Sequence, residues 1–251
     1  MKKQLFIYAL LSGMMLMSCG KQDVLPRQAA AVNIMNAVVG SSYLATNFKG
    51  GLPYDYYYTF VLGYADASLP TRHYSMNAGE QPIWIYNYPD TTAKDEPLVK
   101  LNLHLAAGSI HMVYVTGTLA KPDTLLTEES LPYHPAGDST TSIRFINLSP
   151  GSGPVKVVQR GKSAPEAASL PFKTQSAFIT YPVNAHLDEY VFEFRDAATD
   201  ALITTFTTTG VHYPPPSSGQ QPWLYQNRAL ALIGIPGGTG KQKQQVMIVK
   251  Y

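Results

Sequence analysis

Residues 143–153 read IRFINLSPGSG, and residues 32–42 read VNIMNAVVGSS, which aligns with them without a gap. Each segment is an apolar strand that ends in Asn and is followed four residues later by Gly. Asn and Gly set turn geometry, because Asn bonds to the nearby backbone and Gly adopts conformations closed to other residues. The two segments therefore predict one unit that occurs twice in the chain. The matched turn residues are Asn147 with Asn36 and Gly151 with Gly40.

The repeat continues along the chain and predicts which side chains face the core. Residues 84–90 match residues 190–196, where charged and aromatic residues alternate. Because successive side chains of a strand point to opposite faces, the aromatic set is expected inside. In the second copy this inward set is Tyr190, Phe192 and Phe194. The same register places Trp84, Tyr86 and Tyr88 in the first core. The match of residues 101–105 to residues 203–207 turns His104 outward.

Composition favours many short strands joined by turns. The chain is 45% hydrophobic and 14% charged, with 17 Tyr, 19 Gly and 19 Pro, and helical periodicity is weak everywhere. We therefore predict an all-β chain of two tandem antiparallel β-sandwich domains, immunoglobulin-like or transthyretin-like in layout. The expected boundaries are residues 31–131 for the first sandwich, residues 132–141 for a linker stiffened by prolines, and residues 142–251 for the second.

The start of the chain is typical of an exported protein. Two lysines precede residues 5–17, an apolar stretch too short to cross a bilayer, and the one cysteine, Cys19, follows after a small residue. This ending resembles the lipobox of bacterial lipoproteins, in which the cysteine is lipidated, with palmitate among its acyl chains, and becomes the first mature residue. We expect a signal peptide over residues 1–18, then lipidated Cys19 and a tether over residues 19–30. The expected location is the outer membrane of the cell envelope. The sequence is compatible with either the periplasmic or the external face of that membrane.

Charge limits the classes of partner. Of the 19 basic residues, two leave with the signal, and the remaining 17 balance the 17 acidic ones. A neutral mature chain lacks the excess of Lys and Arg that phosphate contacts need, so nucleic acid is not an expected partner. The expected partners are the membrane, reached through the lipid, and either a glycan or another envelope protein.

No pattern in the sequence predicts catalysis. Residues 237–241, GGTGK, invite comparison with a phosphate-binding loop, but Ile235 stands where its first glycine is needed, and Gln242 replaces the magnesium-binding hydroxyl residue. A glycine-rich hairpin is predicted instead. The six histidines include no helical pair that could hold zinc, although His104 and His111 could approach one another across a hairpin. We expect no enzyme activity, no cofactor and no metal.

Two aromatic clusters are the candidates for ligand binding. In residues 54–58, YDYYY, tyrosine rings could pack on the apolar faces of sugars, but one alternating set is expected in the core. An insertion in the second copy, residues 211–227, is rich in proline and ends in a second aromatic pair. Such a loop can hold binding residues or cover a sheet edge. The predicted ligand-binding residues are Tyr54, Tyr56, Tyr57, Tyr58, Trp223 and Tyr225.

Residues 143–155, IRFINLSPGSGPV, resemble the opening of the domain of unknown function 4397 (DUF4397). That family typically begins with a hydrophobic strand, an Asn or His, a Ser-Pro turn and a second strand. It often occurs as tandem sandwiches in secreted and lipid-anchored bacterial proteins, particularly of the Bacteroidota type. The resemblance implies this fold and location and no reaction. In the first copy Val38 and Val39 replace the Ser-Pro turn.

Three triplets, residues 90–92, 123–125 and 138–140, are similar to acceptors of protein O-glycosylation in Bacteroidota.

Three functions are compatible with these features. The first is a non-enzymatic lipoprotein of the cell envelope with a binding or structural role. The second is a glycan-binding accessory lipoprotein that uses outward aromatic residues. The third resembles a fimbrillin, an adhesion or pilus subunit with two sandwich domains, whose N-terminal strand is cut after an arginine such as Arg27.

Overall fold

The computed structural model of the chain describes residues 28–51, 61–66, 73–89, 96–183, 189–211 and 222–251. Apart from one short 3-10 turn, η1 (Gly240–Gln242), every regular element in these ranges is a strand. None of their helical segments has the length and apolar character needed to cross a membrane. The prediction of an all-β chain built from sandwiches is confirmed.

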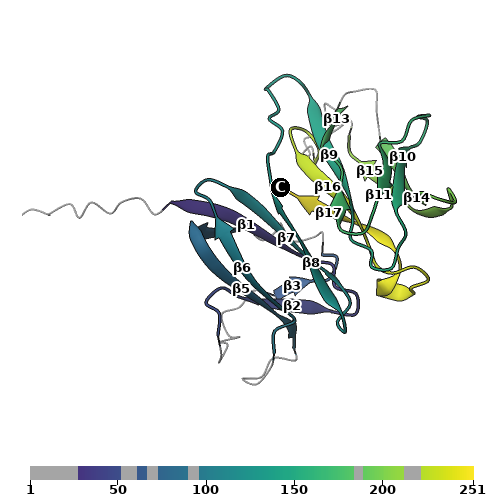
Figure 1. Cartoon of the computed structure of the whole chain (residues 1–251). Helices are drawn as coiled ribbons and strands as arrows, with labels where there is room; N and C mark the ends of the chain where they lie inside the picture. Colours follow the sequence, from purple (N-terminus) through teal and green to yellow (C-terminus); the bar gives the residue numbers. More distant parts are fainter. Residues whose placement is uncertain (1–27, 52–60, 67–72, 90–95, 184–188, 212–221) are drawn as a thin grey trace, which may run out of the picture.

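The first half of the chain forms a sandwich of two four-stranded sheets, with strand orders β4-β1-β7-β8 and β3-β2-β5-β6 (Figure 1). Alternate residues of β1 and β7, such as Ile34 and Val113, meet Leu44 and Ile83 from the other sheet to form one apolar core. The strands are β1 (Ala29–Asn36), β2 (Tyr43–Asn47), β3 (Val61–Gly63), β4 (His73–Asn77), β5 (Gly79–Tyr88), β6 (Val99–Leu105), β7 (Ile110–Gly117) and β8 (Pro122–Glu128).

The second half forms a second sandwich, with strand orders β12-β9-β16-β17 and β11-β10-β14-β15. A further short strand, β13, also pairs with β9. Its core is rich in aromatic residues, and Phe145 contacts both Phe192 and Phe194. The strands are β9 (Thr140–Asn147), β10 (Val155–Gln159), β11 (Ala167–Leu170), β12 (Thr174–Gln175), β13 (Ile179–Pro182), β14 (Glu189–Asp196), β15 (Leu202–Thr209), β16 (Asn227–Ile233) and β17 (Gln245–Lys250).

The two halves repeat one topology, as the sequence match predicts. β1, β2, β3, β5, β6, β7 and β8 correspond to β9, β10, β11, β14, β15, β16 and β17, while β12 and β13 together take the place of β4. In each half the first strand runs parallel to one neighbour, β1 to β7 and β9 to β16, which the sequence did not predict. Gly40 and Gly151 both turn with positive φ, at 94° and 77°. These conformations favour glycine and explain the match at that position.

Asn36 and Asn147 explain why the strand exit recurs. Asn36 Oδ1 accepts a hydrogen bond from the backbone N–H two residues later (3.0 Å), and its Nδ2 donates to the carbonyl of Leu62 in β3 (3.0 Å). Asn147 makes the same two bonds, at 3.1 Å with the N–H two residues later and at 3.0 Å with Leu170 in β11. Both side chains are buried. Each therefore closes its turn and ties the two sheets of its sandwich together.

The prediction that Trp84 and Tyr88 lie in the first core is wrong, whereas Tyr86 is buried as predicted but lies outside that core cluster. Ile83 and Ile85 of β5 occupy that core, and neither has exposed surface. The match of residues 84–90 to residues 190–196 is three residues out of register, because core-facing Leu44 of β2 pairs with Asn87, whereas its counterpart Val155 pairs with Asp196. A slip by an odd number of residues exchanges the two faces of a strand. The aromatic residues of β5 therefore face away from the core.

In the second copy the predicted inward face is confirmed, because Tyr190, Phe192 and Phe194 are all buried. The prediction that His104 of β6 faces outward is confirmed as well, since it is exposed between two buried leucines. The associated match of residues 101–105 to residues 203–207 is also three residues out of register, because Leu101 pairs with Ile83 and its counterpart Phe206 pairs with Phe192. In β15 it is Thr208 that is buried, while Thr207 beside it is exposed.

The two sandwiches pack against each other, so the four sheets form successive layers (Figure 1). The inner sheets, which contain β1 and β7 in one half and β9 and β16 in the other, are covered on both faces. Their second faces share an apolar cluster between the sandwiches: Met35, Met112, Tyr114, Ile146, Leu148, Ala229, Ala231, Ile233, Met247 and Val249. Burial on both faces explains the runs of consecutive apolar residues within these strands, such as residues 112–115 of β7 and residues 229–233 of β16.

A buried ion pair lies at this interface. Glu129, directly after β8, places Oε2 2.8 Å from Nη1 of Arg144 in β9, with the two side chains 1% and 7% exposed. The Arg144 guanidinium also stacks on the ring of Phe178, 3.7 Å from its centroid. Nearby, the hydroxyls of Tyr114 and Tyr251 lie 2.9 Å apart. The charges of two different sandwiches therefore neutralise each other away from water.

The predicted linker is fixed to the second sandwich by hydrogen bonds. His134 Nδ1 lies 2.9 Å from Thr140 Oγ1, and its Nε2 lies 3.1 Å from Asn227 Oδ1. Asn227 Nδ2 donates to the carbonyl of Pro132 (3.0 Å). The ring of Tyr133 between these contacts is 85% exposed. The linker thus lies against β16 instead of connecting the halves loosely.

Candidate functional site

The outward side of the sheet β3-β2-β5-β6 carries aromatic side chains. Because Ile83 and Ile85 point into the core, Trp84, Tyr86 and Tyr88 of β5 project from the opposite side. Tyr88 lies across from Tyr43 of β2, with ring centroids 6.4 Å apart and planes at 86°. Tyr43 is 47% exposed, the largest exposure of any described ring on this side. We call Tyr43, Trp84 and Tyr88 the aromatic face.

Trp84 combines an aromatic ring with a charged neighbour. Lys100 of β6 pairs with Trp84 across the strands and places Nζ 4.9 Å from the ring centroid. The same ammonium lies 3.1 Å from Glu96. A cation over an indole ring is attracted by its π electrons, so the Lys100 side chain is held at this end of the face.

A polar triad extends the aromatic face along β5 and β6. Glu80 Oε2 accepts a hydrogen bond from Nδ2 of Asn102 (2.8 Å), and Glu80 Oε1 lies 2.8 Å from Nδ1 of His104. All three side chains are exposed. From Tyr88 to Glu80 the face covers eight steps of β5, roughly 27 Å at about 3.4 Å per residue. It is therefore a long, open surface, and its polar groups hold one another in fixed positions.

Tyr86 lies on the same side of β5 but has no exposed surface. Burial raises the pKa of its hydroxyl, with a hydrogen bond to Asn47 acting in the opposite direction. Its ring therefore supports the sheet instead of presenting a surface to a ligand.

The predicted ligand-binding residues fall into three groups. Tyr54, Tyr56, Tyr57 and Tyr58 lie outside the described residues. The placement of Trp223 on a binding surface is wrong: it is 5% exposed, belongs to the second core, and donates from Nε1 to the carbonyl of Thr209 (2.8 Å). Its large apolar ring gains more from burial than from exposure. Tyr225 is 38% exposed, but its hydroxyl accepts a hydrogen bond from the backbone N–H of Gly137 (2.8 Å), which ties it to the linker.

The aromatic face itself was missed by reasoning from the sequence. The alternation of β5 was visible, with Ile83 and Ile85 on one side and aromatic residues on the other. Both sets are apolar, so alternation alone did not identify the inward one. The pairing of Leu44 with Asn87, which only the folded sheet supplies, decides it.

His104 and His111 do not come together. His104 in β6 contacts Glu80, whereas His111 belongs to β7 of the other sheet, where its Nε2 lies 2.8 Å from Ser109 Oγ. In the part of the chain that the structure describes, no group of three or more His, Cys, Asp or Glu residues is placed to hold a metal ion.

Residues 237–241 lie in the connection between antiparallel β16 and β17, so the predicted hairpin is confirmed, with η1 inside it.

No protein-family model and no curated protein matches this chain. Two solved structures are similar at low TM-score. One is a streptococcal virulence factor described by its binding of alpha-glucan, with a TM-score of 0.25 and 10% identity over 81% of this chain and 93% of that one. The other is a candidate adhesin from Bacteroides ovatus, with a TM-score of 0.23 and 9% identity over 90% of this chain and 97% of that one.

Proposed function

We propose that this protein is a non-enzymatic, glycan-binding module of the cell envelope, and that the aromatic face is its ligand surface. The observation that carries the proposal is that one side of a single sheet carries the paired rings of Tyr43 and Tyr88 at one end and the exposed triad of Glu80, Asn102 and His104 at the other. Sugar rings present apolar C–H faces and a rim of hydroxyls. Tyrosine rings pack on the former, and carboxylate, amide and imidazole groups bond to the latter.

The shape of the face favours an extended ligand. A sheet surface of roughly 27 Å offers successive contacts along β5 to an extended chain. Several weak contacts in a row suit a polysaccharide, whose repeating units meet the rings in turn. The ends of the face also differ, because Tyr43 and Tyr88 lie at one end and the polar triad lies at the other.

The same geometry argues against catalysis on this face. Glu80 and His104 are its nearest approach to an acid–base pair, and their side chains are 61% and 78% exposed. General acid–base catalysis relies on a site that excludes water. An exposed pair on a sheet surface lacks this shielding, and it serves better to orient hydroxyl groups.

We also propose that a lipid on Cys19 holds this surface at the membrane, as the export segment predicts. The first strand begins at Ala29, ten residues after Cys19. A fully extended chain spans at most about 3.3–3.6 Å per residue, so the tether reaches roughly 35 Å at most. Labelling with radioactive palmitate tests the anchor: incorporation that Cys19→Ala abolishes supports it, and equal labelling of both proteins refutes it.

A glycan array followed by calorimetry tests the ligand. Full-length protein in nonionic detergent should bind a neutral glycan chain. Tyr43→Ala should weaken that binding at least tenfold with an unchanged Tm, because the ring is half exposed. Asn102→Ala should weaken it less. Tyr133→Ala is the matched control, since its ring is 85% exposed but lies in the linker. If Tyr43→Ala and Tyr133→Ala bind alike, the aromatic face is not the site.

The fimbrillin-like alternative makes a different prediction. Arg27 lies outside the described residues, and a cut after it precedes β1, which pairs with both β4 and β7. Protein trimmed at Arg27 would then keep every described strand. Polymers formed only after trimming would support that alternative, and a trimmed protein that stays monomeric would speak against it.

A further inference from the structure

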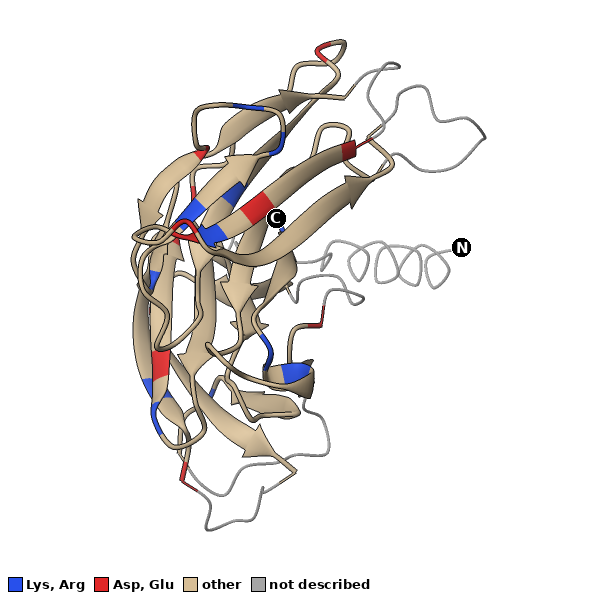
Figure 2. Cartoon of the chain, turned by 90° about the vertical axis from the view of Figure 1, so that its right-hand side faces the viewer, with Lys and Arg blue, Asp and Glu red and all other residues tan. Residues whose placement is uncertain are grey.

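The opposite outer sheet, β11-β10-β14-β15, carries a charged hollow where the first sandwich carries its aromatic face. The hollow has a volume of about 340 Å³ and opens to solvent. Four cationic and two anionic side chains line it, and Val158 is its one side chain of a hydrophobic type. The charged lining residues are Lys156, Arg160, Lys162, Arg195, Glu193 and Asp200. Charged residues make up only 14% of the chain and are thinly spread in the view of Figure 2, so this cluster is a local feature. One of its cations, Lys162, also pairs with Glu166 (2.8 Å).

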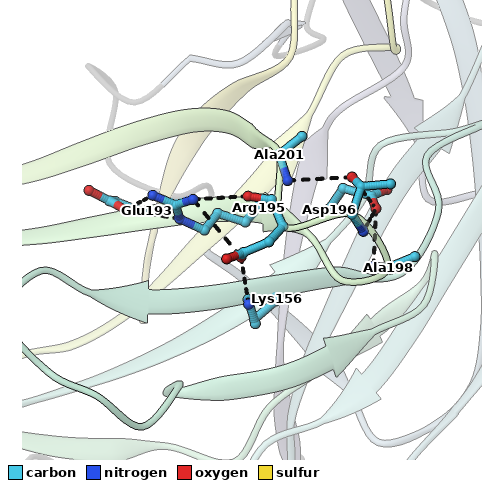
Figure 3. A network of polar contacts seen from close by, with 8 residues as sticks. Lys156, Glu193, Arg195, Asp196, Ala198 and Ala201 are labelled. Atoms are coloured by element: carbon cyan, nitrogen blue, oxygen red, sulfur yellow. Dashed lines mark hydrogen bonds and ion pairs between the residues drawn. The ribbon is translucent and has the colours of Figure 1, made fainter.

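Three hydrogen bonds to two residues, Glu193 and Asp200, hold the Arg195 guanidinium in place (Figure 3). Its Nε and Nη2 donate to Glu193 Oε2 at 3.0 and 2.6 Å, and its Nη1 donates to the carbonyl of Asp200 at 2.9 Å. The hydrogen bonds from Arg195, followed by those from Arg160, hold the pKa of Glu193 below its usual range. Glu193 is therefore a fixed anion at the floor of the hollow.

Arg160 has N–H donors that are not used by the ion pair with Glu193. Its Nε donates to Glu193 Oε1 (3.2 Å), and its side chain is 63% exposed. Among the described residues, its two terminal nitrogens have no partner. A carboxylate at Nε leaves the two terminal nitrogens of the guanidinium available to a ligand as a planar pair of donors. That fork fits two oxygens of a carboxylate or a sulfate.

The second cation is positioned by the hairpin between β14 and β15. Asp196 Oδ1 accepts hydrogen bonds from the backbone N–H groups of Ala198 (3.0 Å) and Thr199 (2.8 Å), which closes the turn (Figure 3). This turn presents Asp200, whose carboxylate lies 2.5 Å from Lys156 Nζ. The Lys156 ammonium is thereby held at the rim of the hollow, with donors left for another acceptor.

We propose that this hollow binds an acidic saccharide, with the fork of Arg160 holding its carboxylate or sulfate group and the Lys156 ammonium donating to a neighbouring hydroxyl oxygen. Glu193 is a positioning residue that orients Arg160. The open, almost wholly polar lining suits a hydrated sugar and offers no pocket for the apolar side chains of a peptide. Because the sheets are layered, this site lies on the opposite side of the molecule from the aromatic face. It does not depend on the proposed function of that face.

Calorimetry with full-length protein in nonionic detergent tests the site. The probes are an oligogalacturonate, its methyl ester, a sulfated dextran oligosaccharide and an acidic peptide of equal charge. The oligogalacturonate or the sulfated probe should bind, and whichever is tighter identifies the anion. Arg160→Gln should weaken binding at least tenfold, as expected for lost hydrogen bonds to a charged group. Arg160→Lys should recover only part of it, because an ammonium keeps the charge without the fork.

Three controls make the result decisive. Lys241→Gln removes one positive charge from η1, outside the hollow, and Tyr43→Ala alters only the aromatic face, so both should bind the acidic probe normally. The Tm of Arg160→Gln should equal that of the natural protein, since this side chain is exposed. Equal losses in Arg160→Gln and Lys241→Gln, equal binding of the methyl ester, or equally tight binding of the acidic peptide would each overturn the proposal.

Discussion

Removing the carboxylate of Glu129 should destabilise the whole molecule, because it leaves Arg144 as an uncompensated charge between the two sandwiches. The two side chains are almost fully buried, and Arg144 Nε already lacks a hydrogen-bond partner among the described residues. Glu129→Ala also removes the acceptor of the Thr127 hydroxyl. Breaking a buried ion pair from one side costs about 3–5 kcal/mol. For a chain of this size that corresponds to a fall in Tm of roughly 6–20 °C.

The assay is thermal and urea unfolding of the variant beside Glu128→Ala. Glu128 is the preceding residue and is exposed, so its removal should leave the free energy of unfolding within about 0.5 kcal/mol of the natural value. The double variant Glu129→Leu with Arg144→Met removes both charges and keeps most of the volume. It should regain most of the loss, because desolvating two charges offsets much of their attraction. If Glu129→Ala melts within 2 °C of the control, the pair is not a buried charge at a closed interface.

Three further predictions concern the turns and the charged hollow. Asn147→Ala and Asn36→Ala should each lower the free energy of unfolding by about 2–4 kcal/mol, since each strips several buried hydrogen bonds; values below about 1 kcal/mol in urea unfolding would contradict this. The pKa of Glu193 is depressed by Arg195, so its ion pairs stabilise the fold above about pH 4.5 and are lost as the pH falls through the folded pKa. In carbon-detected NMR titration, the midpoint of Glu193 should rise in Arg195→Gln, and an unmoved midpoint would refute the coupling. Gly117→Ala should cost several kcal/mol in chemical denaturation, because φ is 79° and a methyl group would overlap a backbone carbonyl, whereas a near-neutral effect would mean that the turn between β7 and β8 relaxes.

Much of the fold could be predicted because the repeat and the strand exits are local. The Asn-to-Gly spacing at Asn36 and Gly40 recurs at Asn147 and Gly151, and turn chemistry depends on residues close in sequence. The inward face of β14 was predictable too, since Glu193 and Arg195 mark the other side as polar. Each of these predictions needed only a few consecutive residues.

The candidate sites could not be predicted in the same way. The aromatic face depends on which of two apolar sets in β5 turns inward, and a slip of one residue reverses the answer. The charged hollow depends on Arg160 and Arg195, which stand 35 positions apart and meet at Glu193 through the pairing of β10 with β14. The sequence suggested that Trp223 is an exposed ring on a loop, but in the folded protein it is buried in the second core.

The sequence alone determined the duplication, the strand content and the turns, together with the prediction of an anchor at Cys19. Only the tertiary structure decided that the inner sheets are covered on both faces and that two chemically different surfaces face away from each other. The physical reason is that alternation and turn chemistry act between near neighbours along the chain. Burial and charge pairing act between strands that come together only when both sandwiches close.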